Sequence, residues 1–155
     1  MTVSAYDRVP FRGVTVNRRM KRALEWAERQ DGVPTLQLSQ GAYSGTVAAS
    51  GSTHDGGGSV DIRTSVMSER QRRATMKALK RAGWAAWFRD ERDGFSPHIH
   101  AVLIGDKQAS NSARWQMGEF DAGRNGLTSQ RADRNPWRPK ERVRFSFRQK
   151  RPVPR

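Results

Sequence analysis

Residues 52–61 have the sequence STHDGGGSVD, and the expected fold depends most on this glycine-rich segment. It places His54 and Asp61 seven positions apart, with three consecutive glycines between them. Glycine tolerates positive φ, so the segment can turn tightly and bring the two side chains to one point. Val60-Asp61-Ile62, at the end of the turn, predicts a short strand.

Residues 97–102, PHIHAV, contain the other two histidines of the chain, His98 and His100. The surrounding apolar residues predict a strand from His98 to Ile104. Side chains alternate along a strand with period two, so His98 and His100 project from the same face. One of them can bind a metal while the other lies beside it, aimed at a substrate.

The residue types available restrict the chemistry of any metal site. The chain has no cysteine, which excludes disulfides, thiolate metal sites and a cysteine nucleophile. A metal must therefore be bound by imidazole and carboxylate groups. A catalytic zinc takes three protein ligands and keeps one position open for water. An H-x-H pair alone, or a histidine in a glycine-rich loop, is more often structural, but their combination with Asp61 indicates a metal site.

Outward from these motifs, the spacing of apolar residues predicts helices and further strands. Asn17 or Thr15 caps the first helix, and a capping box of Ser68 and Gln71 opens the second. Helices are expected at 16–27, 68–83 and 109–120, and strands at 35–39, 60–62, 84–88 and 98–104. Residues 1–13 are expected to form an irregular lead-in. Together these elements predict an α+β fold, with a small antiparallel sheet that carries Asp61 and His100 and with helices packed on it.

The chain as a whole is typical of one domain made in the cytoplasm. Its 155 residues, about a third of them apolar, suffice for a compact core. The N-terminal residues lack the apolar segment of a signal peptide, and no apolar run has the length of a transmembrane helix. We therefore expect no membrane partner, and export only with the help of another agent.

Charge is concentrated at the C-terminal end. The formal net charge is +14, from 29 basic and 15 acidic residues, which attracts polyanions without specifying a fold. Residues 121–155 are expected to form a basic, partly ordered extension of a domain at residues 1–120. The alternation in Val143–Phe147 leaves open an edge strand there. Anionic cell-wall polymers are the expected partners of the extension. Nucleic acid is the least favoured partner, because no helix-turn-helix, RNP or zinc-finger pattern is present.

The glycine-rich stretch resembles the first motif, S-x-H-x-x-G-x-A-x-D, of the zinc D-alanyl-D-alanine carboxypeptidases and related phage endolysins. The matching residues are Ser52, His54, Gly57 and Asp61, while Ser59 replaces the alanine. The second motif of that family is a histidine on a strand, often within H-x-H, and residues 97–100 resemble it. The likeness covers about residues 35–105, and it is greatest to a branch found in actinobacteria and their phages.

This resemblance implies a fold shared with lysostaphin-type enzymes and with the signalling domain of hedgehog proteins. It implies a zinc ion bound by His54, Asp61 and His100, with His98 beside it to stabilise the oxyanion or to handle protons. Residues 1–120 are then a zinc peptidase-like domain. The implied reaction is cleavage of a peptidoglycan peptide, between D-residues or at an L-to-D bond. It would take place at the cell wall after release of the protein, or from a virion.

The general base is where the sequence departs from the family. Many relatives have an acidic residue three positions before the ligand histidine, and Pro97 occupies that position here. Asp90, Glu91 and Asp93 lie earlier in the same loop, and Asp93 is the candidate base; alternatively, all three only keep the loop solvated. The departure leaves open a second function, that of a zinc-containing wall-binding or virion structural protein without catalysis.

Gln40 and Ser52 are the candidate substrate-binding residues. The family holds the substrate carboxylate with an upstream basic or amide side chain, but the S-G-Y-R signature of some members is absent. Gln40 lies in a comparable place within residues 39–43, where a role in a turn is the alternative. Ser52 occupies the first position of the motif. Trp115 and Trp137 have polar surroundings suited to stacking on sugar rings, although core packing is the usual role of tryptophan.

Overall fold

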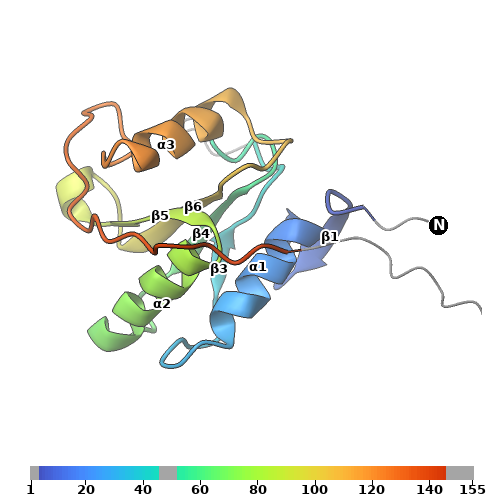
Figure 1. The fold of residues 1–155 in the computed structure, drawn as a ribbon, viewed down its shortest axis with the longest axis horizontal. Helices are drawn as coiled ribbons and strands as arrows, with labels where there is room; N and C mark the ends of the chain where they lie inside the picture. Colours follow the sequence, from blue (N-terminus) through green and yellow to red (C-terminus); the bar gives the residue numbers. More distant parts are fainter. Residues whose placement is uncertain (1–3, 46–51, 146–155) are drawn as a thin grey trace, which may run out of the picture.

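The computed structural model describes residues 4–45 and 52–145, and over these residues the fold is α+β, as the sequence predicts. Two small antiparallel sheets and three helices are present (Figure 1). The larger sheet has the strand order β3-β4-β6-β5. Its strands, in that order, are Leu38–Gln40, Ser59–Arg63, His98–Leu103 and Trp84–Arg89.

The larger sheet lies between two helical layers. Helices α1 (Arg18–Glu28) and α2 (Glu69–Arg81) cover one face, and α3 (Asn111–Asp121) lies on the other (Figure 1). Alternation along each strand divides the side chains between the two faces. Residues such as Ile62 and Ile99 enter the main core under α1 and α2, while Trp87, Val102 and Phe120 form a smaller cluster under α3. The α3 side is the one that carries the histidine-rich site.

The second helix forms as its sequence predicts. Ser68 Oγ accepts a hydrogen bond from the Gln71 backbone N–H at 3.1 Å, and Gln71 Oε1 accepts one from the Ser68 N–H at 2.9 Å. This capping box satisfies two N–H groups that the first turn leaves without partners. The helix ends at Arg81, shortly before Gly83, whose φ of +95° continues the chain in a left-handed conformation.

The prediction for the N-terminal residues is wrong. Residues 1–13 are expected to be irregular, but Arg8–Phe11 (β1) pairs with Val14–Asn17 (β2) in an antiparallel hairpin. Arg12 and Gly13, both with positive φ, form its two-residue turn, which is the backbone geometry that matches the twist of a hairpin. Val16 is therefore a buried strand residue rather than the start of a helix. The first helix begins after Asn17, whose side chain caps it, as one of the two alternatives predicts.

Two other boundaries differ by a few residues from those expected. The strand expected at 35–39 is β3, Leu38–Gln40, which has a bulge where it pairs with β4. Leu36 is fully buried without belonging to a strand, so burial rather than strand pairing explains its apolar character. The helix expected at 109–120 is α3, and it starts after the cap Ser110.

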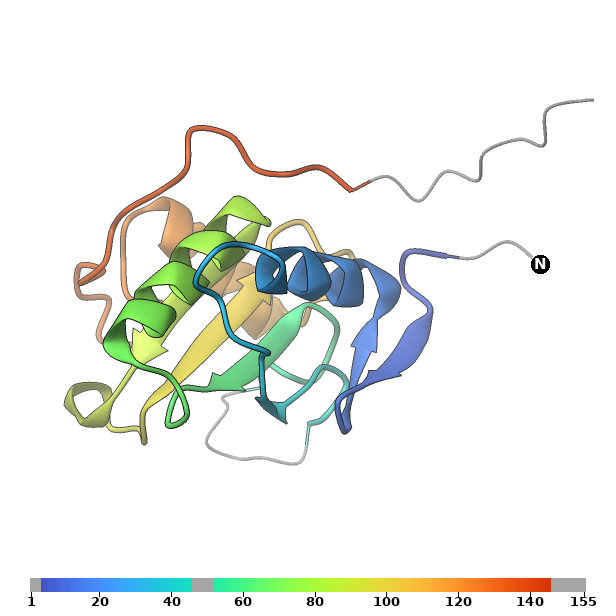
Figure 2. The same cartoon turned by 90° about the horizontal axis from the view of Figure 1, so that it is seen from below.

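The segment that follows α3 packs on the rest of the domain. It crosses the outer side of α2 before it reaches the end of the described chain (Figure 2). Trp87 Nε1 donates to the Arg124 carbonyl at 3.0 Å, and Lys80 Nζ donates to the Asn135 carbonyl at 2.7 Å. Residues 143–145 belong to no strand, and the remainder of the alternating stretch lies outside the described residues. Within the described chain no helix has the length and apolar character needed to cross a membrane.

Candidate metal centre

The register of the larger sheet brings two of the three predicted ligands face to face. Asp61 on β4 pairs directly with His100 on β6, and Trp87 on β5 pairs with His100 from the other side. All three side chains project toward α3. His100 Nδ1 lies 2.8 Å from Asp61 Oδ1, and the indole of Trp87 is stacked near-parallel to the imidazole, with 6.1 Å between ring centroids. The sheet thus fixes the carboxylate and one imidazole against each other.

The third ligand, His54, comes from the glycine-rich turn before β4. Its side chain is fully buried, and its Nδ1 donates to the Gly41 carbonyl at 2.9 Å. Since a carbonyl oxygen can only accept, this bond fixes the proton on Nδ1. Nε2 is then an acceptor, and it lies 3.4 Å from Asp61 Oδ1 without a hydrogen-bond partner among the described residues. A buried acceptor without a donor needs an explanation, and a bound cation is one.

His100 is oriented in the same way by a residue on α3. Gln116 Nε2 donates to the Gly126 carbonyl at 3.1 Å, so its Oε1 faces His100 Nε2 at 2.7 Å and must accept from it. The proton of His100 is therefore on Nε2, and its Nδ1 presents a lone pair to Asp61. Hydrogen bonds of this kind to the outer nitrogen fix the tautomer of histidines that bind metals. Sequence reasoning missed Gln116, because nothing in the pattern of α3 marks it.

The titration of the site agrees with this arrangement. Burial raises the pKa of Asp61, but the two neighbouring imidazoles, His100 and His54, outweigh burial and hold that pKa well below its usual range. Burial lowers the pKa of the His100 imidazole, against the opposing effect of the Asp61 carboxylate. An ionised carboxylate beside a neutral imidazole is the protonation state that a metal requires of its ligands.

Three acceptor atoms, none of which carries a proton, therefore converge at one place. They are His54 Nε2, His100 Nδ1 and a carboxylate oxygen of Asp61. They all lie within 4.8 Å of one another, and the group could hold a metal ion. Two imidazoles and one carboxylate suit zinc and other first-row divalent metals. The three residues that the sequence predicts as ligands are thus brought together by the fold.

His98 lies beside this group, as its position in H-x-H predicts. It is half-buried, and its Nδ1 lies 2.8 Å from the Ser96 carbonyl, which can only accept the proton. Its Nε2 faces the site, 3.9 Å from Asp61 Oδ1. The His98 imidazole therefore lies at the edge of the three ligands and is not one of them.

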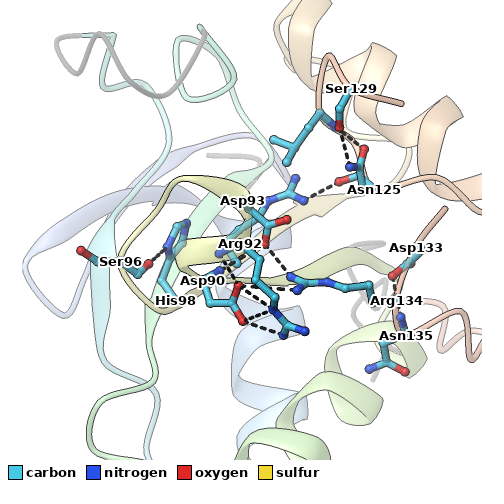
Figure 3. A network of polar contacts seen from close by, with 12 residues as sticks. Asp90, Arg92, Asp93, Ser96, His98, Asn125, Ser129, Asp133, Arg134 and Asn135 are labelled. Atoms are coloured by element: carbon cyan, nitrogen blue, oxygen red, sulfur yellow. Dashed lines mark hydrogen bonds and ion pairs between the residues drawn. The ribbon is translucent and has the colours of Figure 1, made fainter. Parts of the chain in front are cut away.

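The candidate general base, Asp93, is not brought to the site. The loop after β5 forms a 3₁₀ turn, Glu91–Asp93, in which Asp93 accepts a hydrogen bond from the Asp90 backbone N–H. The Asp93 carboxylate also forms an ion pair with Arg134 at 2.6 Å, and it faces that residue (Figure 3). Among the described residues that line the cavity over the ligands, Asp61 is the one carboxylate. The ion pair with Arg134, which lies 41 positions later in the chain, thus directs the Asp93 carboxylate away from the metal ligands.

Of the two candidate substrate-binding residues, Gln40 lies at the cavity over the ligands and Ser52 does not. Gln40 lines the cavity over the ligands, where its amide donates weakly to Ser44 at 3.4 Å. Ser52 is exposed, has a φ of +66°, and does not line the cavity. Its backbone carbonyl accepts a hydrogen bond from the Asp55 N–H, so its place is in the turn that positions His54.

The cavity over the ligands, here called the metal cavity, has a volume of about 710 Å³. The β-strands and the His54 turn form one wall, and the N-terminal half of α3 with residues 126–128 forms another. Trp115 is 41% exposed and lines the cavity, as do Phe95 and Leu127. A mostly apolar cleft with a few polar groups at its base is typical of a small-molecule or peptide site.

Close packing, more than backbone conformation, explains the three glycines of the turn. Of the three, Gly58 alone has positive φ, at +94°. A Cβ at Gly56 would collide with the Gln108 carbonyl, and one at Gly57 would lie 2.8 Å from Asp106 Oδ1. The turn therefore lies directly against residues 106–108, and this contact holds His54 in place.

Replacement of Gly56 by alanine is expected to lower the free energy of unfolding by about 1–3 kcal/mol, because backbone atoms must shift to accommodate the methyl group. Thermal unfolding measures the effect. Gly118→Ala is the matched control: Gly118 is an exposed residue of α3 with no atom within 4 Å of an added Cβ, so this change is expected to be neutral or stabilising. An equal loss of stability in both variants would contradict the packing argument.

Replacement of Gln116 by leucine is expected to weaken metal binding by about 10–100-fold, because His100 loses the acceptor that fixes its tautomer. Competition with a chelator of known affinity measures the change. Gln116→Glu keeps an oxygen acceptor at that position and is expected to bind metal more tightly than the leucine variant. Equal affinity of wild type and Gln116→Leu would show that the hydrogen bond has no such role.

No protein-family model, curated protein or solved structure matches the chain.

Proposed function

We propose that the protein is a zinc-dependent peptidase that cleaves peptidoglycan peptides. The observation that carries the proposal is the convergence of three proton-free acceptors from His54, Asp61 and His100 at the base of an open cavity. This matches the ligand set of catalytic zinc sites, which use three protein ligands. The resemblance of residues 52–61 and 97–100 to the D-alanyl-D-alanine peptidase motifs supports the substrate class, and with it a hedgehog-like fold.

The metal ion and the side chains around it have separate proposed roles in the reaction. Zinc, when bound, supplies Lewis acidity and makes water nucleophilic near neutral pH. His98 presents Nε2 to the cavity from the edge of the ligand group, and when both ring nitrogens carry protons its place suits stabilisation of the negative charge that develops on the substrate oxygen. The exposed indole of Trp115 and the amide of Gln40 are the proposed substrate contacts. The site of action is the cell wall, reached after release of the protein or from a virion.

One observation favours a second candidate, a zinc-containing wall-binding or virion protein without catalysis. In the described chain, the metal cavity contains no carboxylate besides Asp61 to act as a general base. General acid–base catalysis commonly contributes about two to four decades in rate. Under this candidate, metal is still bound at the same residues, but no peptide is cut.

Digestion of purified actinobacterial peptidoglycan distinguishes the two candidates. Zinc-loaded protein is expected to release new amino groups, and mass spectrometry of the fragments identifies the bond that is cut. Chelator-treated protein and Asp61→Asn are expected to release none. Zinc-loaded protein that binds the wall without cleavage would establish the second candidate, and a protein that binds no metal would overturn both.

A further inference from the structure

A second cavity lies on the other side of the edge strand β5, between α2 and the segment of residues 125–137. It has a volume of about 530 Å³ and shares a single lining residue, Arg89, with the metal cavity. Seven cationic side chains line it, four of them from α2, against two carboxylates, Asp93 and Asp133. This space, here called the cationic cavity, therefore carries a local excess of positive charge.

Both carboxylates of the cationic cavity are already engaged. Asp93 forms an ion pair with Arg134 at 2.6 Å, as Figure 3 shows, and Asp133 forms one with Arg138 at 3.1 Å. Arg138 approaches from outside the lining. Two further lining cations, Arg73 and Arg92, form ion pairs with Glu69 and Asp90 just outside the lining. The lining cations that form no ion pair within the described residues are Arg72, Lys77, Lys80 and Arg89.

Two of those cations are buried as well as unpaired. Lys80 is 1% exposed and Arg89 is 3% exposed, and in the described chain neither forms an ion pair. Lys80 Nζ donates only to the Asn135 carbonyl, and Arg89 donates to the Asn125 carbonyl while its Nη2 has no partner. A buried charge without a partner is costly. Burial accordingly lowers the pKa of Lys80 to about 8, against the opposing effect of Asp133, and that of Arg89 to about 10, against the opposing effects of Asp93 and Asp133.

The rim of the cationic cavity offers further cations that can move. Arg72 lies over the ring of Phe88 at 4.0 Å, and Lys77 lies 5.5 Å from the ring of Trp137. Neither forms an ion pair within the described residues. Arg72 is half-buried and Lys77 is exposed, and long side chains of this kind can reach a ligand in the cavity, while the buried cations behind them supply a field that water screens little.

We propose that the cationic cavity binds a phosphate or diphosphate group. A multiply charged anion supplies the counter-charge that Lys80 and Arg89 lack, with Arg72 and Lys77 as its direct contacts. A single carboxylate would leave most of the lining cations unpaired, whereas arginine and lysine together are the usual ligands of phosphate. The site is separate from the metal ligands, so the proposal does not depend on peptidase activity.

Isothermal titration with inorganic pyrophosphate at physiological ionic strength tests the proposal. Wild type is expected to bind one pyrophosphate per chain, and the dissociation constant is expected to rise at least tenfold in Arg72→Gln/Lys77→Gln. Arg18→Gln/Lys107→Gln removes two exposed charges that lie outside the cavity and is the matched control, expected to bind as wild type does. Equal weakening in both double variants would assign binding to net charge alone and overturn the proposal, as would absence of binding to wild type.

Lys80→Met provides an independent readout. Removal of a buried, unpaired charge is expected to raise the melting temperature in phosphate-free buffer and to abolish the further rise that pyrophosphate produces in wild type. A pyrophosphate-dependent rise that persists in Lys80→Met would contradict the proposal. Displacement of pyrophosphate by short poly(glycerol phosphate) would identify a polymer-borne phosphate as the ligand, whereas binding of pyrophosphate without such displacement would identify a small free one.

Discussion

His54→Ala is expected to abolish stoichiometric metal binding, whereas wild type is expected to hold about one metal ion per chain. His54 Nε2 is one of three acceptors in the group, and its loss leaves two protein ligands where a catalytic zinc site uses three. The loss of affinity should therefore exceed the roughly 100-fold expected when an outer hydrogen-bond partner of a ligand is removed. Elemental analysis of tag-free protein measures the metal content.

Asp61→Asn tests whether a loss of metal in His54→Ala is caused by misfolding of the domain. His54 is fully buried, so its truncation leaves a cavity that destabilises the domain by itself. Asparagine has nearly the shape of aspartate, and it removes the ionised oxygen without opening a void. Loss of metal in both variants, with circular dichroism like that of wild type for Asp61→Asn, would establish the site. Full metal content in Asp61→Asn would overturn it.

The stability of the protein gives a second readout of the same site. A metal present at about 1,000 times its dissociation constant stabilises the folded state by about 4 kcal/mol. At this chain length, that corresponds to a rise in melting temperature of about 8–16 °C. Chelation is expected to reverse the rise in wild type and to have no effect on Asp61→Asn.

The identity of the metal decides the kind of chemistry. Two histidines and one carboxylate bind zinc in hydrolases, but the same set also binds iron(II) in oxygenases. Zinc in protein purified from cells grown in mixed metals would support the peptidase proposal. Iron in its place would contradict that proposal and would direct the substrate search to oxidation.

The second large effect is expected at His98. His98→Ala should reduce the rate of peptide hydrolysis by about 100–1,000-fold, which is the cost of removing one donor to a developing oxyanion. His98 is not among the ligands, so the variant should keep its metal. It is therefore the matched counterpart of His54→Ala: one histidine variant loses the metal, and the other keeps it and loses turnover.

The dependence of the rate on pH tells a role in chemistry from a role in structure. If His98 acts through its titratable Nε2, the pH profile of kcat/KM in wild type contains a transition that His98→Gln lacks. An unchanged profile with a reduced rate would limit His98 to a positional role. Full activity of His98→Ala would remove it from the proposed mechanism.

Local features of the fold follow from the sequence because their causes lie within a few residues. The capping box of Ser68 and Gln71 predicts the start of α2, since both partners belong to one turn. The alternation of a strand places His98 and His100 on one face, and both lie near Asp61. The N-terminal hairpin is missed because each of its strands has four residues and Pro10 interrupts the pattern.

Residue patterns are enough to predict the α+β class and the grouping of His54, Asp61 and His100 in one candidate site. Long-range packing determines which nitrogen of each histidine carries the proton, through Gly41 and Gln116. It likewise decided that Asp93 faces Arg134 rather than the metal cavity, and that Lys80 and Arg89 are buried without counter-charges. The reason is physical: caps and strand alternation depend on neighbours a few positions away. Proton placement and charge pairing instead depend on partners 13 to 41 positions distant, which packing alone brings into contact.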